Sequence, residues 1–213
     1  MTRLRTAPTK SALLNLRKQV RFLEDGHTLL ERKRELLTRL VYQHIHEYRE
    51  LKGAAEAALQ KAYRWLSIAQ LRMGDRTITQ ATLGASPSTR MKVLPRRSLG
   101  VQYPSVEAHV VAPQPVGLLG TDPSFDEARH TFAEASVQLA RLAAVEMALY
   151  RLISEQRKAQ KRVNALKYNI IPSYRKAIKR IAEALEEEER GTLFQIKRLR
   201  EAADRRKISS QTA

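Results

Sequence analysis

The sequence predicts an all-α protein, a long antiparallel left-handed two-helix coiled coil with an irregular insert at one end. Two long segments almost free of glycine and proline flank a short segment in which both are concentrated. Within the first long segment, apolar residues recur every seven positions, the period of a left-handed coiled coil. Aromatic residues form only 6% of the 213 residues. Small aliphatic side chains must therefore fill the core, and they suit narrow seams between helices.

The first long helix is expected over residues 9–73, with Thr9 as its N-cap. Only Gly26 and Gly53 interrupt it, and each weakens a helix by about 1 kcal/mol without ending it. Its clear heptad row carries leucine at most positions, with His44 as a polar exception, and a weaker row runs through Ala55 and beyond. At ~1.5 Å per residue, this helix would be a rod roughly 100 Å long.

The second long helix is expected after Pro123, with Ser124 as a candidate cap and acidic residues near its positive end. Its apolar stripe changes register near Glu146, so the heptad is not strict. Pro172 lies inside the helix and is expected to kink it locally. The predicted division is a first helix over residues 1–75, an insert over 76–123, a second helix over 124–207 and a flexible tail over 208–213.

The insert over residues 76–123 contains six of the eight prolines, which excludes a long helix there. Its short valine-rich pieces are typical of brief strands. We interpret the segment as irregular, with a short β-hairpin as one form that it can take.

The two long helices are expected to pack as an antiparallel hairpin, with both chain termini at the same tip of the rod. Each helix then buries the apolar stripe of the other. The predicted seam contains Leu16, Leu23, Leu30, Leu37, Leu51, Val163, Leu166, Ile170, Ile178 and Ile181.

The chain is strongly basic, with 39 Lys and Arg against 22 Asp and Glu and a formal net charge of +17. The cations gather toward both ends of the chain, which indicates an acidic partner at the shared tip, either nucleic acid or a protein cavity lined with carboxylates. The alternative is that these cations lie on a solvent-exposed face of the coiled coil and bind no partner. The candidate partner-binding residues are Arg17, Lys18, Arg21, Lys161, Arg162, Lys197 and Arg198.

No pattern that carries catalytic chemistry is present in the sequence. It has no cysteine and no phosphate-binding Gly-x4-Gly-Lys loop. His44 and His46 are two residues apart on a helix and point away from each other, so they cannot share a metal. The run of glutamates from 186 to 189 wraps around the helix and is interpreted as a solvated face. We therefore expect no catalytic residue, no metal site and no cofactor. No stretch approaches the ~18 apolar residues that span a bilayer, and no secretory signal is visible.

Two segments, residues 8–37 and 161–201, resemble the D subunit of the V-type and A-type rotary ATPases, the central shaft of that machine. The most specific motifs are RVNAL at 162–166, the Ile-Pro pair that follows it, and FQIKR at 194–198. Lys167 departs from the glutamate that the family usually carries after Asn-Ala-Leu. The helix–insert–helix layout extends the likeness over nearly the whole chain.

The resemblance implies a non-catalytic rotor shaft that couples ATP hydrolysis or synthesis to proton or sodium transport. Its partners would be the A and B subunits of the catalytic ring, the F subunit of the central stalk and the membrane-side socket (the C or d subunit), without nucleic acid. The complex would hold the chain in the cytoplasm, peripheral to the membrane. The alternative from another class is a basic coiled-coil adaptor that binds nucleic acid or ribosomes.

Overall fold

The computed structural model of the protein describes residues 7–112, 114 and 120–211. Contacts divide these residues into two compact units. The first unit comprises the described residues up to Arg32 and from Ala159 onward, and the second comprises Lys33–Lys158. Helices α1 (Lys10–Met73) and α3 (Pro123–Ala165) each contribute to both units. The predicted class is confirmed: long helices dominate, and the insert holds a two-stranded antiparallel hairpin.

Helix α1 is continuous through Gly26 and Gly53, as the spacing of its breakers predicts. Thr9 caps it, because its Oγ1 accepts a hydrogen bond of 3.2 Å from the backbone N–H of Ala12. The helix ends at Met73 because Gly74 follows with a φ of 78°, a left-handed conformation that favours glycine and breaks the helical path.

In the first unit, helix α4 (Ile171–Gln211) packs antiparallel against the start of α1. Leu16 of α1 is buried against Ala177 and Ile181 of α4. Two ion pairs define the direction: Glu24 pairs with Arg175 at 2.6 Å, and Lys10 pairs with Glu189 at 2.7 Å. The packing around this cluster is completed by Leu13, Tyr174, Ile178 and Leu185.

A π-helical turn, η1 (Leu166–Ile170), joins α3 to α4 immediately before Pro172. The N–H of Ile171 donates to the carbonyl of Leu166, five residues back instead of four. Proline cannot donate to the carbonyl four residues earlier and its ring collides with that carbonyl, so a wider turn relieves the conflict. The helix disturbance expected at Pro172 is therefore present as a π turn.

The predicted seam residues differ in burial. Ile170 is 36% exposed, because the π turn shifts the angular position of the residues within it away from the α-helical stripe. Leu16, Leu37, Val163 and Ile181 are buried. The half-buried members are Leu23, Leu30, Leu51, Leu166 and Ile178.

In the second unit, α1 packs against α3 through small side chains. Ala55, Ala62 and Ala69 are at most 1% exposed, and they belong to the heptad row that looked weaker in the sequence. Alanine allows the helix backbones to approach closely, so the small row faces the partner. Ion pairs between the two helices join Lys33 to Glu155 and Lys61 to Glu134.

Asp122, and not Ser124, caps the start of α3. The Asp122 carboxylate accepts hydrogen bonds from the backbone N–H and the hydroxyl of Ser124, while Pro123 occupies the first helical position. These bonds, with the Arg72 guanidinium at 3.2 Å, lower the pKa of Asp122. Ser124 is itself buried, so its hydroxyl needs this acceptor.

The insert contains a helix that the sequence analysis missed, α2 (Asp75–Leu83). Its Ile78 is buried with Ala69 of α1 and Phe125 of α3. The helix is short and directly follows a glycine, so the break at Gly74 masked it. The predicted insert boundary at residue 76 therefore falls inside α2.

The rest of the described insert is a hairpin of β1 (Thr89–Ser98) and β2 (Val101–Val110). The Val111 N–H donates to the Ser88 carbonyl at 2.8 Å, which fixes the alternation of hydrogen-bonded pairs along the ladder. Pro95 lies opposite Pro104, at a pair that makes no ladder bond. Neither proline removes a ladder hydrogen bond, which explains how a proline-rich segment forms two regular strands.

Leu99 and Gly100 form the two-residue turn of the hairpin, with φ values of 49° and 81°. Two positive φ angles define the type I′ turn, which matches the twist of the strands. Glycine adopts this conformation freely, but for leucine the left-handed region costs roughly 1–2 kcal/mol. The turn is therefore strained at one residue.

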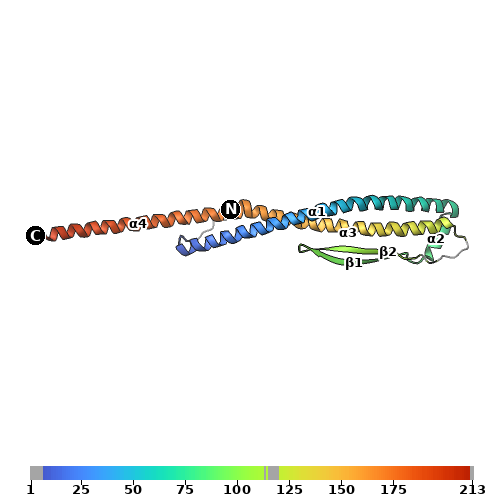
Figure 1. Ribbon diagram of the computed structural model, residues 1–213, viewed down its shortest axis with the longest axis horizontal. Coiled ribbons are helices and arrows are strands. Elements are labelled where there is room, and N and C mark those ends of the chain that lie inside the picture. Colours follow the sequence, from blue (N-terminus) through green and yellow to red (C-terminus); the bar gives the residue numbers. More distant parts are fainter. Residues whose placement is uncertain (1–6, 113, 115–119, 212–213) are drawn as a thin grey trace. The chain divides into compact units, whose positions relative to one another are not determined.

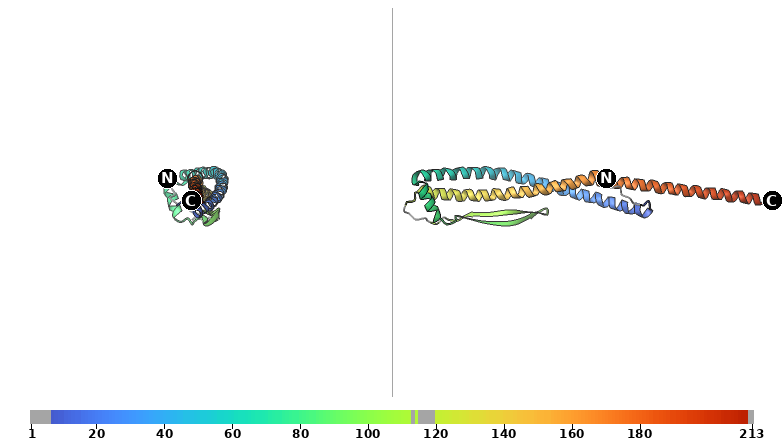
Figure 2. Two further views of the ribbon diagram at one scale, coloured as in Figure 1. Left: turned by 90° about the vertical axis from the view of Figure 1, so that its left-hand side faces the viewer. Right: turned by 180° about the vertical axis from the view of Figure 1, so that it is seen from behind.

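The hairpin packs along the helices of the second unit, beside α3 (Figures 1 and 2). Tyr103 of β2 meets His44 of α1 edge to face, with ring centroids 5.8 Å apart. Arg151 of α3 donates to the outward-facing carbonyl of Gln102 at 2.8 Å. Val101 and Ala108 are buried although they lie on opposite faces of the ribbon, because the hairpin twists along its length.

Replacing Leu37 with alanine is expected to lower the free energy of unfolding by about 2–5 kcal/mol, because Leu37 is fully buried and a void remains. Its neighbour Leu36 is 46% exposed, so Leu36→Ala is a matched control expected to cost about 1 kcal/mol or less. Urea unfolding followed by circular dichroism measures both. Equal losses for the two variants would show that the seam lies on another face.

Candidate partner-binding surface

Helix α4 continues beyond the residues that pair with α1. The Lys10–Glu189 ion pair marks the start of α1, whereas α4 runs on to Gln211. Every residue from 190 to 201 is exposed. We call residues 190–201 the lone segment of α4, because no other described element covers them.

The lone segment is rich in exposed apolar side chains. Leu193, Phe194 and Leu199 are 67%, 63% and 71% exposed, and Ile196 is 44% exposed. Water-exposed apolar residues gathered on one short stretch mark an interaction surface. Lys197, Arg198 and Arg200 alternate with them, so the segment offers apolar contact and positive charge together.

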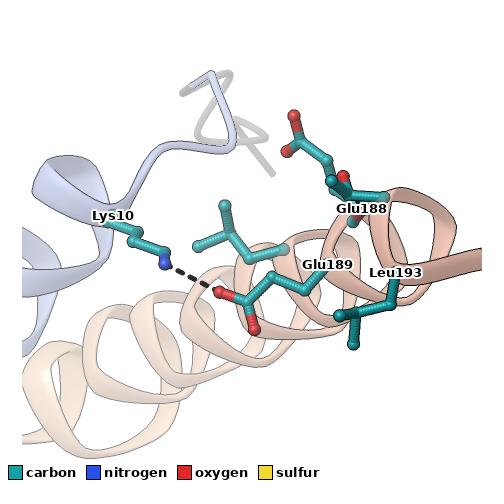
Figure 3. Close-up of a pocket in the computed structure, with 6 residues that line it drawn as sticks. Lys10, Glu188, Glu189 and Leu193 are labelled. Atoms are coloured by element: carbon teal, nitrogen blue, oxygen red, sulfur yellow. Dashed lines mark hydrogen bonds and ion pairs between the residues drawn. The ribbon is translucent and has the colours of Figure 1, made fainter. Parts of the chain in front are cut away.

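An open groove of about 500 Å³ lies where the lone segment begins (Figure 3). The ammonium of Lys10 reaches across it to the carboxylate of Glu189, while Glu188 points away from that contact (Figure 3). The hydrogen bond and charge of Glu189 raise the pKa of Lys10, and those of Lys10 lower the pKa of Glu189. The groove is lined by Lys10, Leu185, Glu188, Glu189, Thr192 and Leu193.

The seven predicted partner-binding cations do not form one tip. Leu16 packs level with Ala177 and Ile181, so the neighbouring Arg17, Lys18 and Arg21 lie beside the paired part of α4. Lys197 is eight residues past Glu189, about 12 Å further along the helix. For the described helices, the expectation of one shared tip is wrong: α1 begins at Lys10, beside Glu189, whereas α4 continues through Gly191 to Gln211.

Lys161 and Arg162 are exposed on α3, between the buried residues Ala159 and Val163. No acidic residue lies between Glu155 and Glu183, so this stretch of α3, η1 and α4 carries only cationic charges of its own. Arg175 is balanced by Glu24.

The π turn adds an exposed patch that the sequence analysis did not assign. Lys167, Tyr168, Asn169 and Ile170 are four consecutive exposed residues, and the Lys167 ammonium lies 5.6 Å from the centre of the Tyr168 ring. Pro172 was the available signal, because a proline inside a helix displaces the residues of the preceding turn.

The described residues contain no group of three or more His, Cys, Asp or Glu that could hold a metal ion. His44 instead hydrogen-bonds Glu47 on its own helix at 2.9 Å. None of the described helices is both long and apolar enough to cross a membrane.

The comparisons with known proteins agree on one family. The sequence model of the ATP synthase D subunit matches residues 12–201. The chain is 35% identical to the D subunit of the V-type ATP synthase of Thermotoga neapolitana, over 93% of this chain and 98% of that protein. It is 31% identical to the D subunit of the A-type ATP synthase of Thermococcus sibiricus, over 94% and 96% of the two chains. The A-type D subunit of Pyrococcus furiosus is 31% identical, over 92% of this chain and 94% of its own length.

This chain belongs to the family of ATP synthase D subunits. It is a subunit of a V-type or A-type ATPase complex, and the resemblance found in the two terminal segments is confirmed over nearly the full length.

The contribution of the Lys10–Glu189 ion pair to the stability of the folded chain is expected to be lost at both low pH and high pH. Glu189 has a lowered pKa. Its contribution to stability is therefore present above the ordinary value of 4.5 and is lost as the pH falls through the lowered pKa. Lys10 has a raised pKa, so its contribution is present below 10.5 and is lost as the pH rises through the raised pKa.

Lys10→Met is expected to move the titration midpoint of Glu189 upward, toward 4.5. Carbon-detected NMR titration of the Glu189 carboxyl measures this shift. Lys18→Met, which removes an exposed lysine of the same helix, is the control and leaves the midpoint in place. An unchanged midpoint in Lys10→Met would contradict the ion pair.

Proposed function

We propose that this chain is the central rotor shaft of a V/A-type ATPase or ATP synthase, and that it couples ATP hydrolysis or synthesis to ion transport. The single observation that carries the proposal is the lone segment of α4. A helix with Leu193, Phe194 and Leu199 open to water and cations between them fits inside a protein cavity that supplies apolar contact and carboxylates.

The cavity is that of the ring formed by the catalytic and regulatory A and B subunits. A single helix has no threefold symmetry, so it cannot contact three equivalent catalytic interfaces in the same way. At each rotational angle it favours a different conformation at each interface. That difference in contact energy is what couples rotation to ATP turnover.

The shaft performs no chemistry in this mechanism. The groove beside Lys10 is open, and its carboxylates lie on one helix surface that faces water. In this proposal the ATP-binding groups belong to the ring subunits. The second unit, with its hairpin and α2, is the part that meets the F subunit of the stalk and the socket subunit of the membrane-bound ring. The chain works on the cytoplasmic side, peripheral to the membrane.

Phe194→Ser combined with Leu199→Ser is expected to uncouple the complex without unfolding the chain. Both side chains are exposed, so the free subunit keeps its helical content and melting temperature. In the reconstituted complex, ions transported per ATP fall by about tenfold, because apolar contacts at the centre of an interface carry most of its energy.

The matched control is Phe22→Ser with Leu29→Ser, which removes a phenylalanine and a leucine that are 76% and 66% exposed on α1, outside the lone segment. It leaves the ratio of ions to ATP unchanged. Normal coupling in the Phe194/Leu199 variant would contradict the insertion of the lone segment. Nucleic acid or ribosomal proteins in place of ATPase subunits in the purified native complex would support the adaptor alternative.

Charge reversal is expected to act cumulatively. Exposed ion pairs are worth ~0–1 kcal/mol each, so Arg198→Glu alone assembles and weakens coupling mildly. Reversal of Lys197, Arg198 and Arg200 together impairs assembly, more strongly at low salt, where charges are screened least. Shaft retention at two ionic strengths measures both. Normal retention of the triple variant at low salt would show that shape alone guides insertion.

A further inference from the structure

The hairpin turn carries a residue that its conformation disfavours. Leu99 has a φ of 49°, in the left-handed region, and is 36% exposed. Asparagine or aspartate followed by glycine is the common choice for a type I′ turn, because both tolerate positive φ. A type I′ turn does not require an apolar side chain at this position. Backbone strain that persists at an exposed apolar residue points to a use for its side chain.

The strands that present Leu99 are basic. Arg90, Lys92, Arg96 and Arg97 are all exposed on β1, and none of the four forms an ion pair with a described residue. Glu107 is the one acidic residue of the two strands. Arg96 and Arg97 are within three residues of Leu99, so uncompensated positive charge borders the exposed apolar side chain.

Residues next to the turn contact the helices of the second unit. Tyr103 contacts His44 of α1, and Gln102 accepts a hydrogen bond from Arg151 of α3. Tyr103 and Gln102 both lie within four positions of Leu99 along the chain. The side chain of Leu99 is therefore presented by an element whose neighbouring residues are fixed, which lowers the entropy lost when a partner binds.

We propose that the hairpin turn is a docking element, in which Leu99 enters an apolar pocket bordered by carboxylates on another subunit of the ATPase complex. This inference rests on the proposed function in one respect, that the partner belongs to the same complex. Leu99 supplies the apolar anchor, and Arg96 and Arg97 meet the carboxylates around it. Burial of the leucine side chain offsets the strain of the turn.

The strain makes folding and docking separable. Leu99→Asn suits the type I′ turn, so hydrogen exchange of the hairpin amides in the free chain becomes slower. The same substitution removes the apolar anchor and weakens docking. Leu99→Met retains an apolar side chain of similar volume, and it keeps docking while leaving the strain in place.

Docking is measured in the assembled complex with a photo-crosslinking residue at Gln102, an exposed, uncharged position opposite Arg97 in the ladder. The expected crosslink joins this position to one protein segment that contains Asp or Glu. Its yield falls about tenfold in Leu99→Asn and is retained in Leu99→Met. Arg96→Glu with Arg97→Glu lowers the yield as well, and reversing the mapped carboxylates to lysine restores it.

Three results would overturn the proposal: an equal yield in Leu99→Asn and Leu99→Met, crosslinking to lipid or nucleic acid, or no crosslink from an assembled complex. Faster hydrogen exchange of the hairpin in Leu99→Asn would contradict the strain itself. Failure of the rotor proposal is recognised separately. The chain would then be absent from the ATPase complex, or its removal would leave ATP hydrolysis coupled to ion transport, and neither result depends on the residue at position 99.

Discussion

The structure depends on the need of a long amphipathic helix to bury its apolar stripe against a second helix. Isolated helices are marginal in water, and most helical stability in proteins comes from such packing. The start of α1 meets this need through Leu16 against Ala177 and Ile181, and its end meets it through alanines against α3. Past Glu189 the same need is unmet within the described part of the chain, and that is where apolar residues are exposed to water.

This unmet need links the fold to the proposed role. Helix α4 is packed against α1 along one part and exposed along another. The packed part is held in place by its contacts, and the exposed part is available to a partner. The ion pairs Lys10–Glu189 and Glu24–Arg175 join α4 to α1 in the packed part, and the first of them lies immediately before the lone segment. A shaft needs both properties, because torque is transmitted only if the contact surface is anchored to a part that does not yield.

The hairpin reconciles a proline-rich sequence with regular strands. Its prolines lie where the ladder has no hydrogen bond to lose, and its twist lets opposite faces of the ribbon pack on the helices at opposite ends. At the turn, Leu99 adopts a backbone conformation that leucine disfavours. Local conflict of this kind is expected where function, and not stability, determines the residue.

The heptad of leucines and the scarcity of breakers allowed the fold class and the extent of α1 to be predicted from the sequence. The row that contains Ala55 was judged the weaker one, although its alanines are buried. Heptad patterns emphasise large residues, whereas close helix packing favours small ones. Asp122 was missed as a cap because Pro123 precedes Ser124 and shifts the helix start by two residues. The level at which α1 begins beside α4 depends on packing register across distant residues, which no local pattern contains. The lone segment was therefore predicted as basic but not as unpaired.

Our central proposal is that this chain turns while the ring stands still. The most direct measurement fixes the ring subunits to a surface and follows a bead attached to the second unit of the chain while ATP is hydrolysed. We expect continuous rotation in one direction, at a rate that rises with ATP concentration until the ring saturates. Steady ATP hydrolysis by intact complexes in which the bead stays fixed would contradict the proposal.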